Sequence, residues 1–156
     1  MESKQMEKYT DSLYYQIKLT EKICKIFCKQ LEETLNLPIT IDEFTILDII
    51  NTHNGEMHQR DLAKMLFKDR ANTGKMLNKL EEKGYIIRKE ETRNKRQVNI
   101  MTVTKEGKEI IKTIGDEIRP LFEKIENRIS KEEAEICKRH MRNVRDVITE
   151  SIEIDI

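Results

Sequence analysis

The fold of this chain is decided by residues 58–107, which read HQRDLAKMLFKDRANTGKMLNKLEEKGYIIRKEETRNKRQVNIMTVTKEG. The pattern predicts a helix, a short turn, a second helix, a glycine stop and a two-stranded hairpin. Polar and cationic side chains follow the second helix and gather at the hairpin tip: Arg70, Asn72, Thr73, Lys75 and Lys79, then Arg93, Lys95 and Arg96. A helix that enters a DNA major groove beside a basic loop on the adjacent backbone needs this order of parts.

Positive charge is concentrated in the same stretch. The whole chain balances 29 Lys and Arg residues against 29 Asp and Glu residues. Residues 60–96 hold 12 basic and 6 acidic residues, a local charge of +6, which leaves −6 for the remainder. Because phosphate affinity depends on the local density of cations, this asymmetry favours a polyanionic partner. The charges alone leave open the alternative of a solvated charged face.

Length and composition indicate one helical domain with much exposed surface. The 156 residues suffice for a single core, yet apolar content is only 37% and charged content is also 37%. An elongated protein, or one that completes its core with a second copy, has such a composition. No apolar run is long enough to span a membrane and the N-terminus lacks a signal-peptide core, so we expect a cytoplasmic protein with three reduced cysteines.

The sequence offers no motif for catalysis or for metal binding. A glycine-rich phosphate loop, a nucleophile elbow and a Cys–His pair with an orienting group are all missing from it. His53, His58 and His140 lack a second ligand at metal-binding spacing. We therefore expect no enzyme activity, no metal and no cofactor.

Local signals place the remaining helices. Apolar residues at helical spacing predict a first helix that stops near Asn36, ahead of Pro38. Residues 40–43 form a capping box, with Ile39 and Phe44 placed as a hydrophobic staple for the next helix, and a third helix is expected from about His58 to Phe67. The stripe of the first helix consists of Leu13, Ile17, Cys24, Phe27, Leu31 and Leu35.

The second half of the chain has equally clear stops. Asp69 is a suitable N-cap and Gly84 a suitable C-terminal stop for the helix between them. Strands are expected at 85–87 and 98–103. Thr104 then caps a long amphipathic helix that Pro120 should kink or interrupt, and the capping box at 130–133 opens a last helix.

Long amphipathic helices therefore flank the central lobe at both ends. One chain has little to cover their apolar stripes, so we expect them to pair with the same helices of a second copy. A two-fold dimer would present two recognition helices roughly 34 Å apart. Packing of these helices onto their own lobe is the alternative.

The chain resembles the multiple-antibiotic-resistance regulator (MarR) family of winged-helix transcription factors over nearly its whole length. Residues 69–84 look like the family's recognition helix, and 91–96 look like its wing motif Asp-x-Arg-Asp-x-Arg, followed by Thr-x-x-Gly at 104–107. The resemblance implies a mainly α fold with a small β-hairpin, a DNA-binding lobe at 40–104, and dimerisation helices at 1–37 and 105–156. A homodimeric regulator, more often repressor than activator, would bind a pseudo-palindromic operator.

Some positions depart from the family pattern. Glu91 and Asn94 stand where the family usually has Asp, which puts a wing-stabilising Asp–Arg pair in doubt. The stretch from Arg96 to Thr104 is one residue longer than usual, which implies a bulge or an extended hairpin. Gly74 replaces a frequent Thr or Ser on the recognition helix, and glycine there costs about 1 kcal/mol of helix stability against alanine.

The predicted DNA contacts have distinct roles. Asn72 suits an adenine edge, Thr73 a thymine methyl group, and Arg70 a guanine or a phosphate. The wing arginines are expected in or beside the minor groove, or bracing the hairpin. The full set is Arg60, Arg70, Ala71, Asn72, Thr73, Lys75, Lys79, Arg93, Lys95 and Arg96.

Two kinds of signal are open. The family binds ligands where the dimerisation helices meet the lobe, which here implies a small effector among Leu13, Tyr14, Ile17, Phe44 and Ile111. Alternatively, oxidation of Cys24 or Cys28 regulates DNA binding, with Cys28, at the edge of the apolar stripe, the more reactive thiol.

The alternative to DNA binding is a winged-helix module that binds an acidic protein. A cationic helix face without apolar anchors argues against this alternative.

Overall fold

The computed structural model describes residues 8–54, 56–66 and 70–152. The chain divides into two compact units, residues 1–42 and 43–156. The first holds a short 3-10 helix, Tyr9–Asp11, and the long helix α1, Leu13–Thr34. The second holds nearly all of α2 (Ile41–Thr52) and every later element.

The limits of α1 follow from local chemistry. The Ser12 side chain accepts a hydrogen bond from the Tyr15 backbone N–H at 3.0 Å, and the helix ends two residues before Asn36, whose φ is +47°. The predicted stop near Asn36 is confirmed. The Glu32 carboxylate then accepts the Ile41 N–H at 2.7 Å and so satisfies one of the free donors at the start of α2. Thr40 precedes the first residue of α2, as a capping box requires, and the box itself stays a prediction.

The core of the second unit lies among three short helices. These are α2, α3 (Gln59–Leu66) and α4 (Arg70–Glu82). Their inward side chains, Ile46, Leu47, Ile50, Leu62, Leu77 and Leu80, have no exposed surface. Burial of each such side chain contributes about 1.5–3 kcal/mol, so this cluster holds the helices together.

The predicted stop at Gly84 is confirmed. Its φ of +75° lies in the left-handed region, and the N–H groups of Gly84 and Tyr85 bond back to the carbonyls of Glu81 and Leu80 at 2.8 and 2.9 Å. The predicted cap at Asp69 lies outside the described residues.

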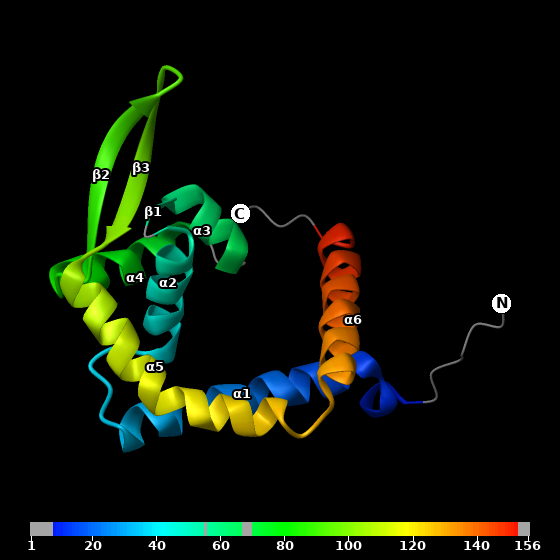
Figure 1. Cartoon of the computed structure of the whole chain (residues 1–156). Coiled ribbons are helices and arrows are strands. Elements are labelled where there is room, and N and C mark those ends of the chain that lie inside the picture. The colour runs from blue at the N-terminus through cyan, green and yellow to red at the C-terminus, as the bar shows by residue number, and fades with distance from the viewer. Residues whose placement is uncertain (1–7, 55, 67–69, 153–156) are drawn as a thin grey trace. The chain divides into compact units, whose positions relative to one another are not determined.

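The sheet has three strands in the order β1-β3-β2, all antiparallel (Figure 1). They are β1 (Glu56–His58), β2 (Ile86–Arg93) and β3 (Arg96–Val103). Sequence reasoning missed β1 and began a helix at His58, whereas α3 begins at Gln59. Three residues are too few to show a period, and β1 exists because Met57 pairs with the buried Met101.

The β2–β3 hairpin is longer than predicted and has no bulge. Eight residue pairs stay in one register from Ile86–Val103 to Arg93–Arg96. The two-residue turn, Asn94 and Lys95, has φ values of +51° and +62°, as a type I′ hairpin turn requires. Of the two predicted explanations for the extra residue, the extended hairpin is confirmed and the bulge is wrong. In the outer half of the hairpin every side chain except Val98 is polar, so no apolar alternation marked residues 90–97 as strand.

Two helices complete the second unit: α5 (Lys105–Glu126) and α6 (Lys131–Glu150). Thr104 caps α5 by accepting the Gly107 N–H at 3.0 Å, and the capping box of Ser130 and Glu133 is present at α6, so both predicted caps are confirmed. Pro120 lies inside α5 without ending it, and Figure 1 shows that this helix bends along its course. The helix is kinked and not interrupted.

Candidate nucleic-acid interface

Helix α4 presents a polar face built from its own periodicity. Leu77 and Leu80 face the core, which leaves Asn72, Lys75 and Lys79 exposed along one side, with Ala71 beside them. Arg70 is the first residue of α4, and its side chain lies outside what the structure describes. The predicted contact by Thr73 is wrong in this structure, because its side chain has no exposed surface. Thr73 lies four residues before Leu77 and shares the inward stripe, a spacing that was visible in the sequence.

The tip of the hairpin carries the three predicted wing cations. Arg93, Lys95 and Arg96 are all exposed. The Arg93 side chain is held by Glu91, whose Oε2 accepts the Nε–H at 3.1 Å and lies 3.1 Å from Nη2. Residues two apart share a strand face, so glutamate at 91 keeps the acid–arginine pair that the departure from aspartate had put in doubt.

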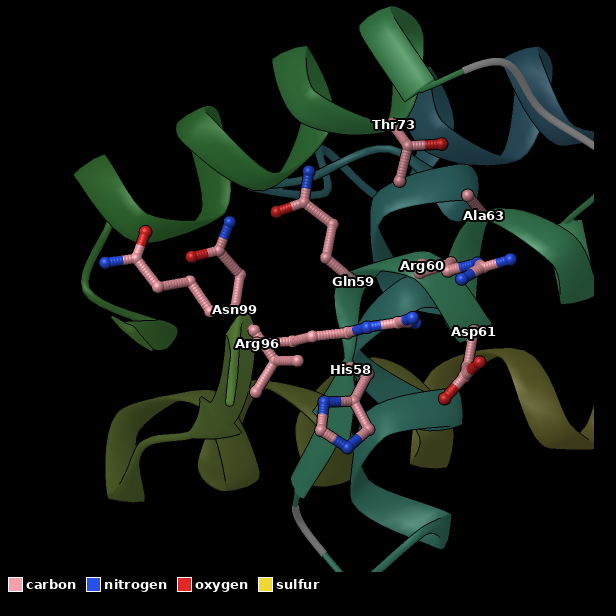
Figure 2. Close-up of a pocket in the computed structure, with 10 residues that line it drawn as sticks. His58, Gln59, Arg60, Asp61, Ala63, Thr73, Arg96 and Asn99 are labelled. Carbon is pink, nitrogen blue, oxygen red and sulfur yellow. The ribbon is translucent and has the colours of Figure 1, made fainter. Parts of the chain in front are cut away.

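A cavity of about 470 Å³ lies between the start of α3 and the wing strand β3 (Figure 2). Arg60 and Arg96, which are far apart in sequence, both line it, and Asp61 is its acidic residue. Thr73 of α4 contributes to its wall. His58 also lines it, and its buried Nδ1 has no hydrogen-bond partner. The remaining lining residues are Gln59, Ala63, Gln97, Val98 and Asn99.

Part of this chain is similar in sequence to a known family. Residues 39–98, which span α2 through the outer part of the hairpin, match the sequence model of the MarR family. No curated protein sequence matches the chain.

Several solved structures share the fold over most of the chain. A MepR–DNA complex from S. aureus is 20% identical with a TM-score of 0.73, covering 90% of this chain and 99% of that one. A mutant MarR from E. coli with operator DNA is 22% identical with a TM-score of 0.67, covering 86% and 99%. NadR in complex with 4-hydroxyphenylacetate is 21% identical with a TM-score of 0.70, covering 92% and 96%. The winged-helix fold predicted from the resemblance is therefore confirmed.

The Thr-x-x-Gly motif at residues 104–107 joins three elements of this chain. The Thr104 hydroxyl donates to the Gly84 carbonyl at 2.6 Å, and its backbone N–H donates to the Tyr85 carbonyl at 3.0 Å. A Cβ on Gly107 would overlap that Tyr85 carbonyl oxygen. Glycine is thus required where the end of α4, the end of β3 and the first turn of α5 meet.

Arg88, within the basic stretch, is bound to side chains of its own unit. Arg88 of β2 binds Glu81 and Asn78 of α4, with its Nη2 at 2.6 Å from an oxygen of each. Arg88 is one of the 12 basic residues counted in the stretch 60–96. The two sides of this contact lie seven and ten residues apart across the Gly84 turn, a separation at which no periodic pattern pairs them.

The three cysteines differ in exposure. All three described thiols are free, with Cys24 and Cys137 exposed and Cys28 half-buried. Burial, together with the nearby Glu32 carboxylate, raises the pKa of the Cys28 thiol. Because the thiolate is the reactive form, this shift argues against Cys28 as the more reactive thiol, and regulation by oxidation stays a prediction.

The predicted effector residues belong to both units of the chain. On α1, Leu13 and Tyr14 are exposed and Ile17 is half-buried; Phe44 of α2 and Ile111 of α5 are half-buried. The effector pocket stays a prediction. No helix within the described ranges is long and apolar enough to cross a membrane.

Proposed function

We propose that this protein is a homodimeric transcriptional regulator that binds a pseudo-palindromic operator in double-stranded DNA and acts as a repressor. Residues 40–104 would form the DNA-binding lobe, and the helices in 1–37 and 105–156 would join the two copies. The MarR-family match over 39–98 supports this assignment.

One observation carries the proposal: the polar face of α4 and the cationic hairpin belong to one unit. Residues in strands rise about 3.3 Å each, so the eight paired residues of β2 and β3 extend the tip roughly 25 Å from the sheet base. With α4 in a major groove, Arg93, Lys95 and Arg96 would reach the adjacent minor groove or its backbone. In that arrangement the phosphate backbone between the two grooves would pass the cavity between Arg60 and Arg96.

The exposed face of α4 also argues against a protein-docking module. Its described exposed positions are alanine, asparagine, lysine and glutamate, without the large apolar or aromatic anchors that dominate protein interfaces. Phosphates and base edges are the partners that such donors suit.

Dimerisation is supported by apolar side chains that face solvent on the terminal helices. On α1, Leu19, Ile23 and Ile26 are all more than 40% exposed, along a second stripe separate from the half-buried Phe27 and the buried Leu31. On α6, Val147 is 63% exposed. A single chain gains nothing by exposing these residues, whereas a second copy would bury them.

A small effector would release the operator by changing the spacing of the two lobes, a coupling usually worth 1–3 kcal/mol. NadR, which shares the fold, is solved with 4-hydroxyphenylacetate. We therefore place a small phenolic or aromatic acid first among effector classes. Titration of a panel of aromatic acids into the protein–operator complex tests this, and unchanged affinity throughout the panel would remove the effector from the proposal.

The test of DNA binding uses a duplex enriched from a randomised pool, titrated at several salt concentrations. The affinity should fall steeply as salt rises, and Arg96→Ala should reduce the log–log slope by about 2 per dimer. Lys112→Ala is the matched control, because Lys112 is an exposed lysine of α5 outside the basic stretch. This substitution should leave the slope unchanged. A flat slope for the wild-type protein would contradict the proposal.

A further inference from the structure

The contact between α4 and β2 contains more hydrogen bonds than a single surface ion pair would provide. Arg88 donates from Nε to Glu81 Oε2 at 3.0 Å and from Nη2 to the same oxygen at 2.6 Å. Nη2 also donates to Asn78 Oδ1 at 2.6 Å. The other Glu81 oxygen accepts the backbone N–H of Arg88 at 3.1 Å. Both carboxylate oxygens are therefore committed to one residue of the strand.

The position of Arg88 in the sheet explains this arrangement. β2 is an edge strand, so alternate backbone N–H groups have no strand partner, and Glu81 satisfies one of them. Arg88 pairs in register with the buried Met101 and lies two residues after the buried Ile86, so its side chain is on the face that α4 covers. Its side chain is only 25% exposed.

Asn78 and Glu81 lie on the C-terminal half of α4, beyond the exposed residues Asn72 and Lys75 that are proposed to enter the groove. The helix is thus held to the root of the wing by one half while its other half is presented to DNA. Hydrogen bonding to Arg88 lowers the pKa of the Glu81 carboxyl, which stays ionised at neutral pH.

We infer that Asn78, Glu81 and Arg88 form a clamp that sets the angle between α4 and the wing, and that Glu81 and Arg88 are positioning residues for operator reading, not DNA contacts. The inference rests on the proposed function. Base readout requires α4 and the wing to reach neighbouring grooves at once, so a change in their angle costs affinity for the operator. Non-specific binding, which depends on charge alone, does not need that angle.

The decisive variant is Glu81→Gln. Loss of its negative charge and loss of the clamp should change the affinity for the enriched duplex in opposite directions. Removal of a negative charge near a polyanion should tighten binding to every duplex. Loss of the clamp should instead weaken binding to the enriched duplex by about tenfold, the size of a coupled contact, while a scrambled duplex is bound as tightly or more tightly. Glu82→Gln removes the neighbouring exposed carboxylate of α4 and is the matched control for charge.

Arg88→Gln separates positioning from phosphate contact. If Arg88 only positions α4, Arg88→Gln should leave the slope of log affinity against log salt concentration unchanged. Loss of a phosphate contact would instead lower that slope by about 1 per protomer. The double variant should bind the enriched duplex no more weakly than either single variant, because one shared interaction is lost once. Arg88→Lys keeps the charge without the planar fork and should show the same loss of preference, and thermal unfolding of each variant checks that the lobe stays folded.

Three results would contradict the clamp. Glu81→Gln and Glu82→Gln could change the affinity for both duplexes equally, or the double variant could lose the sum of the two single losses in affinity for the enriched duplex. The third is a reduced salt slope for Arg88→Gln. In each case wild-type DNA binding, and with it the proposed function, would stand. Absence of salt-dependent binding by the wild-type protein would overturn both.

Discussion

Asn72 is the side chain of α4 that we expect to read a base. It is exposed in the first turn of the helix, and its amide carries both a donor and an acceptor, which match an adenine edge. Asn72→Ala should relax base preference at one position in each half-site, at a cost of roughly 1–3 kcal/mol. Selection from a randomised operator pool measures this preference. Identical sequence preferences for wild type and variant would remove Asn72 from the base-reading residues.

Cys28 is expected to be the least reactive of the three thiols. Burial raises its pKa, so the thiolate fraction at neutral pH lies below that of an ordinary cysteine and increases only as the solution becomes alkaline. Brief alkylation at pH 7, followed by peptide mass spectrometry, should label the exposed Cys24 and Cys137 first. Faster labelling of Cys28 would support Cys28 as the reactive thiol of the redox hypothesis.

At the scale of elements, two helical glycines should respond to alanine in opposite directions. Gly107 opens α5, where a Cβ would overlap the Tyr85 carbonyl oxygen and lie 2.8 Å from Val103 Cγ1. Gly107→Ala should therefore destabilise the fold by about 1–3 kcal/mol, as overpacking does.

Gly74 in α4 is the matched position, because a Cβ there meets nothing within 4 Å. Gly74→Ala should stabilise the protein by about 0.5–1 kcal/mol through the unfolded state and helix propensity. Urea denaturation of both variants gives the two free energies of unfolding. A loss of stability at Gly74 as large as that at Gly107 would show that packing at Tyr85 is not the cause.

At the scale of the whole molecule, the exposed apolar stripe of α1 should be the dimer contact. Ile23 is 58% exposed, and its burial in both copies would contribute about 1.5–3 kcal/mol per side chain. Ile23→Glu should shift the protein from dimer to monomer in sedimentation experiments at micromolar concentration. Operator affinity should fall with it, because two linked lobes bind far more tightly than one.

The neighbouring exposed residue offers a control for that substitution. Lys22→Gln changes the surface of the same helix without adding charge to the apolar stripe and should leave the dimer intact. A wild-type monomer, or an Ile23→Glu variant that remains dimeric, would contradict the proposed arrangement.

The sequence by itself determined the features that depend on a few adjacent residues. Ser130 and Glu133 satisfy each other's backbone donors within one turn, and Gly84 ends α4 because its own φ is positive. The hairpin and its cations were located by the same local reasoning, as was the inward stripe of Leu77 and Leu80. Such signals are readable because the atoms that decide them lie within four residues.

Only the tertiary structure decided the features that depend on distant partners. β1 forms because Met57 meets Met101, and Arg88 is half-buried in an ion pair because Glu81 approaches it across a turn. Cys28 has a raised pKa because of what surrounds it, and Arg60 and Arg96 share a cavity because β3 runs beside the start of α3. Burial, strand pairing and the partners of a charge depend on which segments meet in space, and the spacing of residues along one chain does not contain that information.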